Sequence, residues 1–327
     1  MTARAIRVVA VSFTAGLFAV ASGPLPSRAA AEPAQKVFAS PEEGFSALVA
    51  AARAADQPAL LGILGAKAKP ILESGDPAAD RAGLERFVAS YDAAHAIQNP
   101  SDARAELVTG KDEWPLPIPL VKEPDGWRFD TDAADEEVLD RRIGRNELFT
   151  IQACLAFVDA QREYWERNPD GAPLLHYARR VGSTKGMRDG LYYPTGDGEE
   201  PSPLGPAFAR AKATGYEKSK TGGPTPFHGY IYRILEAQGP HAPDGAYGYV
   251  VGDKLIGGFA LLAYPATYDN SGVMTFLVNQ DGVVYQKDLG PETAKRAQAI
   301  ESYDPDDSWT RVPGKDSAPE PADAASE

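Results

Sequence analysis

Residues 135–168 read DEEVLDRRIGRNELFTIQACLAFVDAQREYWERN, and this stretch decides the fold. On its helical wheel Gln152, Asp159, Glu163 and Glu166 cluster in one narrow polar strip, and apolar residues, Leu148 and Leu155 among them, cover most of the rest. A helix that is apolar on almost every side is buried by neighbours on several sides. The turn sequence Asn168-Pro169-Asp170-Gly171 ends it. We therefore predict one long helix that packs as a spine between two domains.

The residues before this helix predict an N-terminal α+β domain over 36–132. Ser40-Pro41-Glu42-Glu43 is typical of a helix start, with Ser40 as the N-cap and Pro41 in the first turn. Apolar spacing predicts two further helices, at 58–64 and 80–97. Strands are predicted next, at 103–109, 116–122 and 127–130. The prolines at every second position from Pro115 to Pro119 indicate an edge strand, since they remove N–H groups from one side only.

The residues after the helix predict a second domain, so that the long helix and an antiparallel sheet together span 133–312. Alternating or continuous apolar runs predict its strands, at 227–236, 247–251, 254–264, 273–278 and 283–287. A closing helix is predicted over 291–303. The expected fold class is α+β with two domains, the second built from a helix on a four- or five-stranded antiparallel sheet.

The N-terminus predicts export. Arg4 and Arg7 precede an apolar run over 8–20, and Ala29-Ala30-Ala31 supplies a small-residue cleavage site. The apolar run is too short for the roughly 20 residues of a spanning helix, although a retained anchor is the alternative. We predict a cleaved signal peptide over residues 1–31, a periplasmic or secreted protein, and no membrane span after cleavage.

The composition limits the partners. The formal charge is −13, and removal of the three arginines of residues 1–31, which hold no acid, leaves −16. This charge argues against nucleic acid as a partner. An unknown envelope protein or glycan is the expected partner. Residues 313–327 are rich in Ala, Pro, Asp, Glu and Ser and predict a disordered acidic tail.

Short motifs carry a family resemblance over most of the chain, from about Phe38 to Val312. The motifs are Ile143-Gly144-Arg145-Asn146-Glu147, Asp159-Ala160-Gln161-Arg162-Glu163-Tyr164, Asp189-Gly190-Leu191-Tyr192-Tyr193-Pro194, Phe227-His228-Gly229-Tyr230, Gly257-Gly258-Phe259-Ala260, Ser271-Gly272-Val273-Met274-Thr275-Phe276 and Lys287-Asp288-Leu289-Gly290-Pro291. With them the chain resembles a bacterial family catalogued as domain of unknown function 2950. The resemblance implies an exported protein without an established activity.

Two further resemblances concern the fold alone. The N-terminal helices and short sheet resemble the cone-shaped domains similar to nuclear transport factor two. Asn146-Glu147, Ala160-Gln161 and Gly229-Tyr230 are similar to the globular half of type IV pilin-like proteins, in which a helix lies along an antiparallel sheet. The chain departs from pilins because the N-terminal domain stands where their apolar assembly helix would be. We therefore carry over the fold and not filament assembly.

The residue patterns point to no catalytic residues, metal ligands or cofactors. The four histidines show no metal-ligand spacing, and no Cys pair assists them. An acidic cluster at Asp130, Asp132, Asp135 and Glu136 lacks the spacing of a calcium loop and is typical of a helix start. The apolar neighbours of Cys154 indicate a buried thiol rather than a nucleophile.

The strongest binding candidates are aromatic and basic. His228, Tyr230 and Arg233 lie on one predicted strand, with Tyr232 between them, and we group them with the loop residues Tyr192 and Tyr193 as a binding surface. Tyr and Arg are the usual anchors of such surfaces. The alternative is that the strand tyrosines belong to the sheet core and that His228 caps a turn.

These observations give two functional hypotheses. The first is a non-enzymatic binding or scaffolding module of the cell envelope, for which an open aromatic face would argue. The alternative is an envelope hydrolase that uses carboxylates or His228 in the groove between the domains, for which a buried His–carboxylate pair would argue. Pilin-like self-assembly is a third possibility.

Overall fold

The computed structural model describes residues 35–133, 135–213, 216 and 224–313. The predicted signal peptide over 1–31 and residues 314–327 of the predicted tail lie outside this part of the chain. Within the described residues, no helix combines the length and the apolar character needed to cross a membrane.

Side-chain caps fix the N-terminal helices. In α1 (Pro41–Ala54), the Ser40 hydroxyl accepts from the Glu43 N–H at 3.3 Å, as predicted. Asp56 caps α2 (Gln57–Leu64) in the same way, and Asp76 caps α4 (Pro77–Ala93). A short helix, α3 (Lys69–Leu72), lies between them. These caps satisfy N–H groups that have no partner inside the helix.

The N-terminal sheet has the order β1-β2-β4-β5, with β3 beside β2. Its strands are β1 (His95–Ser101), β2 (Arg104–Thr109), β3 (Trp114–Pro115), β4 (Leu120–Glu123) and β5 (Gly126–Phe129). The predicted third helix is wrong at its end, because Ala94 is extended and the chain continues as β1, in which Ile97 pairs with Leu107. The predicted proline edge strand is also wrong. Residues 116–119 form no strand, and β4 lies between β2 and β5.

Helix α5 (Asp135–Arg167) confirms the predicted long helix to within one residue. Cys154 is fully buried on it, and burial raises the pKa of its thiol to about 12. One side of the helix, however, is exposed to solvent although it carries apolar residues. Leu148 and Leu155 are 66% and 42% exposed, and they share the polar strip with Gln152 and Asp159. The predicted burial of these two leucines is therefore wrong.

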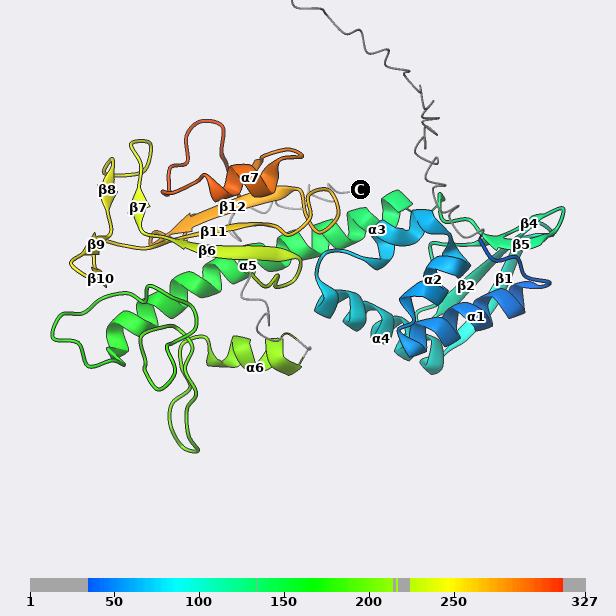
Figure 1. Cartoon of the computed structure of the whole chain (residues 1–327), viewed down its shortest axis with the longest axis horizontal. Helices are drawn as coiled ribbons and strands as arrows, with labels where there is room; N and C mark the ends of the chain where they lie inside the picture. Colours follow the sequence, from blue (N-terminus) through cyan, green and yellow to red (C-terminus); the bar gives the residue numbers. More distant parts are fainter. Residues whose placement is uncertain (1–34, 134, 214–215, 217–223, 314–327) are drawn as a thin grey trace, which may run out of the picture. The chain divides into compact units, whose positions relative to one another are not determined.

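The C-terminal sheet is antiparallel and five-stranded, in agreement with the prediction, with the order β14-β13-β12-β11-β6. Its strands are β6 (Tyr230–Leu235), β11 (Ala260–Pro265), β12 (Met274–Asn279), β13 (Tyr285–Asp288) and β14 (Thr310–Arg311). Helix α5 contacts β11 and β12, and α7 (Thr293–Gln298) contacts β11 from the other side of the sheet (Figure 1). All six residues of β11 are buried, which explains its continuous apolar sequence.

Short paired segments form two separate two-stranded sheets. The predicted turn at Gly252-Asp253 forms, between β9 (Val250–Val251) and β10 (Lys254–Leu255), but the predicted strands 247–251 and 254–264 are each interrupted. Nearby, β7 (Ala237–Gln238) pairs with β8 (Tyr247–Gly248). Helix α6 (Gly205–Ala213) follows the long loop after α5.

The described residues build two hydrophobic cores. The first joins α1, α2 and the N-terminal sheet around Phe38, Phe45, Leu60, Leu107 and Leu120. The second joins α5 and the C-terminal sheet around Tyr164, Tyr230, Tyr249, Phe259 and Phe276. The chain is therefore an α+β protein with mixed helices and antiparallel sheets. Its division into the domains 36–132 and 133–312, and their likeness to transport-factor cones and pilins, stay predictions.

Candidate functional site

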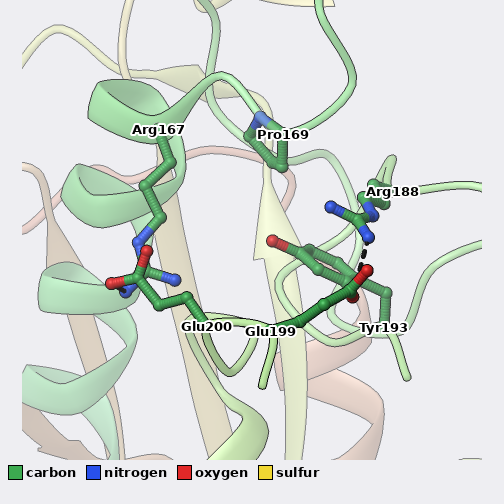
Figure 2. Close-up of a pocket in the computed structure, with 6 residues that line it drawn as sticks. All are labelled: Arg167, Pro169, Arg188, Tyr193, Glu199 and Glu200. Atoms are coloured by element: carbon green, nitrogen blue, oxygen red, sulfur yellow. Dashed lines mark hydrogen bonds and ion pairs between the residues drawn. The ribbon is translucent and has the colours of Figure 1, made fainter. Parts of the chain in front are cut away.

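A pocket of about 350 Å³ lies at the C-terminal end of α5 (Figure 2). Its lining combines two arginines, two glutamates and two rings: Arg167, Arg188, Glu199, Glu200, Tyr193 and Pro169. Arg167 is the last residue of α5, and the other five belong to the loop between α5 and α6. Pockets for small ligands in proteins begin at about 300 Å³, so this one has the size for a small molecule.

The Asp189–Pro194 segment forms one wall of the pocket. Gly190 lies against the backbone of residues 180–183. A Cβ at this position would come within 2.8 Å of the Ser183 nitrogen, so there is room only for glycine. Leu191 is fully buried, and Tyr192 stacks on Phe208 of α6 with ring centroids 4.2 Å apart. This packing leaves Tyr193 facing the pocket.

Each pocket arginine is paired with a glutamate. Arg188 Nη2 lies 3.0 Å from Glu199 Oε2, and Arg167 Nη2 lies 2.6 Å from Glu200 Oε1. Arg167 also pairs with Glu163 on α5 and donates to the carbonyl of Pro201 at 2.6 Å. Two positive and two negative groups thus surround the pocket, with the adjacent glutamates Glu199 and Glu200 between the two arginines (Figure 2).

Tyr193 supplies the aromatic part of the pocket. Its side chain is 5% exposed, and the guanidinium carbon of Arg188 lies 5.1 Å from the centre of its ring. The Tyr193 hydroxyl points between Arg167 and Arg188 (Figure 2). In the part of the chain that the structure describes, this hydroxyl makes no hydrogen bond, so it is free to bind a ligand in the pocket.

A charged cluster is formed by Asp170, which follows the pocket residue Pro169 in the chain, together with His176 and Lys254. Asp170 Oδ2 lies 2.9 Å from His176 Nε2 and 3.2 Å from Lys254 Nζ, and Nζ lies 3.0 Å from Nε2. The Tyr177 carbonyl, which can only accept, lies 2.9 Å from His176 Nδ1, so Nδ1 carries a proton. Burial acts to raise the pKa of Asp170, but the hydrogen bonds from Lys254 and His176 hold it below its ordinary value. This buried His–carboxylate pair is of the type that would argue for an enzyme, and Lys254 contacts both of its members.

His228 lies at a different place from the pocket. Its imidazole stacks on Phe149 of α5 with centroids 3.6 Å apart, and Tyr216 and Phe227 pack beside it. Its backbone has a φ of 49°, and its N–H donates to the Tyr216 hydroxyl at 2.9 Å. No carboxylate bonds its ring nitrogens among the described residues, so it has no group that would orient it as a base.

Asp76 joins segments far apart in the sequence beside His228. Its carboxylate is buried and caps α4 through the Ala79 N–H at 3.1 Å. Oδ2 accepts from the Tyr216 hydroxyl and from the Gly229 N–H, both at 2.8 Å. These bonds tie the N-terminal helices to the start of β6.

The remaining binding candidates are internal. Tyr230 is fully buried, and its hydroxyl donates to the Met274 carbonyl at 2.9 Å. Arg233 donates to the Ala297 carbonyl at 2.8 Å and to the Ile300 carbonyl, at the end of α7. Tyr232 bonds Thr150 of α5 at 3.3 Å. The predicted grouping is thus divided, with Tyr193 at the pocket, Tyr192 stacked on Phe208, His228 at the Asp76 junction, and Tyr230 and Arg233 engaged in packing.

His228 predicts a pH dependence. Burial lowers the pKa of His228 below its ordinary value, Asp76 opposes this shift, and Arg86 and Arg145 add to it. Because the folded pKa lies below the unfolded value of about 6.5, the contribution to stability is complete above that pH and is lost as the pH falls through the folded pKa. We expect the free energy of unfolding to fall less steeply between about pH 7 and pH 5 in His228→Asn than in the wild type, measured by urea denaturation.

His241 gives the opposite control. Its pKa is raised by a hydrogen bond from its ring to Asp304, at 3.0 Å, so its contribution is present below pH 6.5 and is lost as the pH rises. His241→Asn should therefore make the acid loss steeper. Equal slopes in the wild type and His228→Asn would contradict the account of His228.

Among the described residues, no three His, Cys, Asp or Glu side chains are grouped so that they could hold a metal ion. Asp132 of the acidic cluster pairs with Lys67 at 2.6 Å, and Asp130 accepts from the Ala133 N–H at 3.3 Å. In the structure these two carboxylates therefore have protein partners.

The family model described as "Protein of unknown function (DUF2950)" matches residues 35–312. The chain belongs to the DUF2950 family. No curated protein and no solved structure matches it significantly.

The structure explains why separate DUF2950 motifs occur together. Asn146 donates to the Ser271 carbonyl at 2.9 Å, and Glu147 accepts from the Val273 and Met274 N–H groups, both at 2.9 Å. One motif on α5 thereby fixes the start of β12, 125 residues later in the chain. In this chain, these polar motif residues bond α5 to the segment that leads into β12.

The sequence did not reveal five of the six residues that line the pocket: Arg167, Pro169, Arg188, Glu199 and Glu200. A partial signal was present, because Arg188 directly precedes the Asp189–Pro194 motif and Arg167 ends the long helix. The pairing of both arginines with the Glu199-Glu200 dipeptide depends on how the loop folds back on itself.

Proposed function

We propose that this DUF2950 protein is an exported, non-enzymatic binding module of the cell envelope, and that it binds its ligand in the Arg167–Arg188 pocket. The observation that carries the proposal is the free hydroxyl of Tyr193, which points between two guanidinium groups in a pocket of about 350 Å³. Export is inferred from residues 1–31. The partner would be an envelope protein or a glycan that inserts a small group into the pocket.

The energetics favour exchange of the pocket ion pairs for ligand contacts. The Glu199 and Glu200 side chains are 51% and 70% exposed, and ion pairs at such sites contribute only about 0–1 kcal/mol. The Arg167 side chain is better fixed, since it is 26% exposed and donates to the Pro201 carbonyl at 2.6 Å. The Tyr164 hydroxyl holds Arg188 only through its backbone carbonyl, at 2.9 Å, so the Arg188–Glu199 pair is the one that a ligand would most easily displace.

Ligand capture tests this function. The wild type and the double variant Arg167→Gln/Arg188→Gln are each incubated with a soluble envelope extract, passed through a desalting column and examined by native mass spectrometry. We expect the wild type to retain a ligand that the variant lacks. Retention of the same species by both proteins would overturn the assignment of the pocket.

Export is tested separately, by N-terminal sequencing of the native protein, whose sequence is expected to begin near Glu32.

The alternative proposal is an envelope hydrolase. In this pocket it would use the carboxylates of Glu199 and Glu200, beside the Asp170–His176–Lys254 cluster. The observation in its favour is the buried pair of His176 and Asp170, 2.9 Å apart. Accumulation of cleaved products in the extract with the wild type, and not with Glu199→Gln, would favour the hydrolase over the binding module.

A further inference from the structure

The charges of the pocket are balanced within a small volume. Arg167 and Arg188 lie on opposite sides of the pocket, and Glu200 and Glu199 accompany them (Figure 2). A simple anion would gain the two guanidinium groups but would also face two carboxylates. A simple cation would meet the reverse problem. Like charges brought together in this way lower affinity.

A ligand that carries both charges avoids this cost. Its carboxylate could bind a guanidinium by paired N–H donors, which is the favoured geometry for arginine. Its ammonium could bind the glutamate that the guanidinium had released. Every charge in the pocket would then keep a partner of opposite sign, which limits the cost of leaving a charge unpaired.

The rest of the lining suits a short ligand with an apolar part. The Tyr193 ring and Pro169 supply apolar surface, and the Tyr193 hydroxyl adds one free donor between the arginines. The volume of about 350 Å³ lies at the lower end for small-molecule sites. A free dipeptide, which carries an ammonium and a carboxylate a short distance apart, is of this class.

We infer that the pocket recognises a zwitterion, namely a short free peptide whose carboxylate binds Arg188 and whose ammonium binds Glu199. This inference rests on the proposed binding function and names its ligand class. It draws on the two ion pairs, the exposed glutamates and the free Tyr193 hydroxyl.

Three probes separate the two charges of the ligand. Titration calorimetry with the purified protein would use alanyl-alanine, N-acetyl-alanyl-alanine and alanyl-alanine amide. We expect alanyl-alanine to bind and each blocked form to bind at least about tenfold more weakly, because each loses one charged hydrogen bond. Equal binding of the three probes, or no binding of alanyl-alanine, would overturn the zwitterion inference.

Variants test whether the binding uses this pocket. Arg188→Gln and Glu199→Gln should each weaken alanyl-alanine binding about tenfold or more, and Tyr193→Phe should weaken it several-fold. Arg179 is the matched control, since it forms a bidentate pair with Glu236 at 2.8 and 2.7 Å and does not line the pocket. Arg179→Gln should bind as the wild type does. Unchanged binding in Arg188→Gln would also overturn the inference.

The two proposals fail in different ways. If alanyl-alanine does not bind but the wild type still captures a ligand that the double arginine variant lacks, the zwitterion class is wrong and the binding function stands. If the capture experiment shows no difference, the binding function is wrong as well.

Discussion

Asp76→Ala is expected to lower the free energy of unfolding by about 3–7 kcal/mol. The substitution removes the cap of α4, which contributes about 1 kcal/mol, and leaves the Tyr216 hydroxyl and the Gly229 N–H without their acceptor. Each unsatisfied buried donor costs about 1–3 kcal/mol. Urea denaturation followed by circular dichroism measures the change.

Asp92→Ala is the control for this substitution. Asp92 also pairs across helices, with Arg53 at 2.7 Å, but both side chains are about half exposed. Exposed ion pairs contribute only about 0–1 kcal/mol, so this variant should unfold close to the wild type. If the two aspartate variants were equally stable, Asp76 would not join the N-terminal helices to β6 in the manner described.

Gly272→Ala is expected to cost about 3 kcal/mol. A Cβ at this position would lie 2.2 Å from the Tyr230 hydroxyl oxygen and 2.6 Å from two ring atoms. Tyr230 is fully buried and bonded to Met274, so its ring has no free space into which it could move. Overpacking of a core costs about 1–3 kcal/mol, occasionally more. Thermal and urea unfolding both measure the loss.

Gly144→Ala is the matched control. Gly144 belongs to α5, and a Cβ there would meet nothing within 4 Å. Alanine is favoured over glycine inside a helix by about 1 kcal/mol, so this variant should be slightly more stable than the wild type. Equal effects at the two glycines would show that the contact with Tyr230 does not decide the result at Gly272.

The sequence predicted regular elements well where their periodicity was long. The long helix is correct to within one residue because its apolar pattern runs for more than 30 residues. The hairpin of β12 and β13 is also correct, since two apolar runs flank Asn279-Gln280-Asp281-Gly282. In the predicted 80–97 helix the apolar pattern continued into β1, but the Gly110 N–H bonds the Ala94 carbonyl at 2.8 Å and helps to end the helix there.

The candidate site was only partly predictable. Tyr192 and Tyr193 were singled out as aromatic loop residues; Tyr193 lines the pocket, whereas Tyr192 stacks on Phe208. Strand alternation placed Tyr230 and Arg233 on opposite faces, but it could not show that both faces are covered, by α5 and by α7. The pocket arginines and glutamates lie in a loop without periodicity. Their juxtaposition follows from tertiary contacts such as the close approach of Gly190 to Ser183.

The residues of the pocket contribute less to stability than the motif residues do. Most motif residues, such as Asn146 and Glu147, are bonded inside the fold, so their substitution would test folding rather than binding. Arg188 and Glu199 are half exposed and pair only at the surface. Their substitution should leave unfolding almost unchanged, within about 1 kcal/mol, and should change binding alone.

Amide chemical-shift mapping tests the central claim most directly. Alanyl-alanine would be added to the ¹⁵N-labelled protein, and the residues whose backbone signals shift would be identified. The account predicts shifts grouped at the pocket, around Arg188, Tyr193 and Glu199. The absence of shifts, or shifts confined to the surroundings of Asp76 and His228, would contradict it.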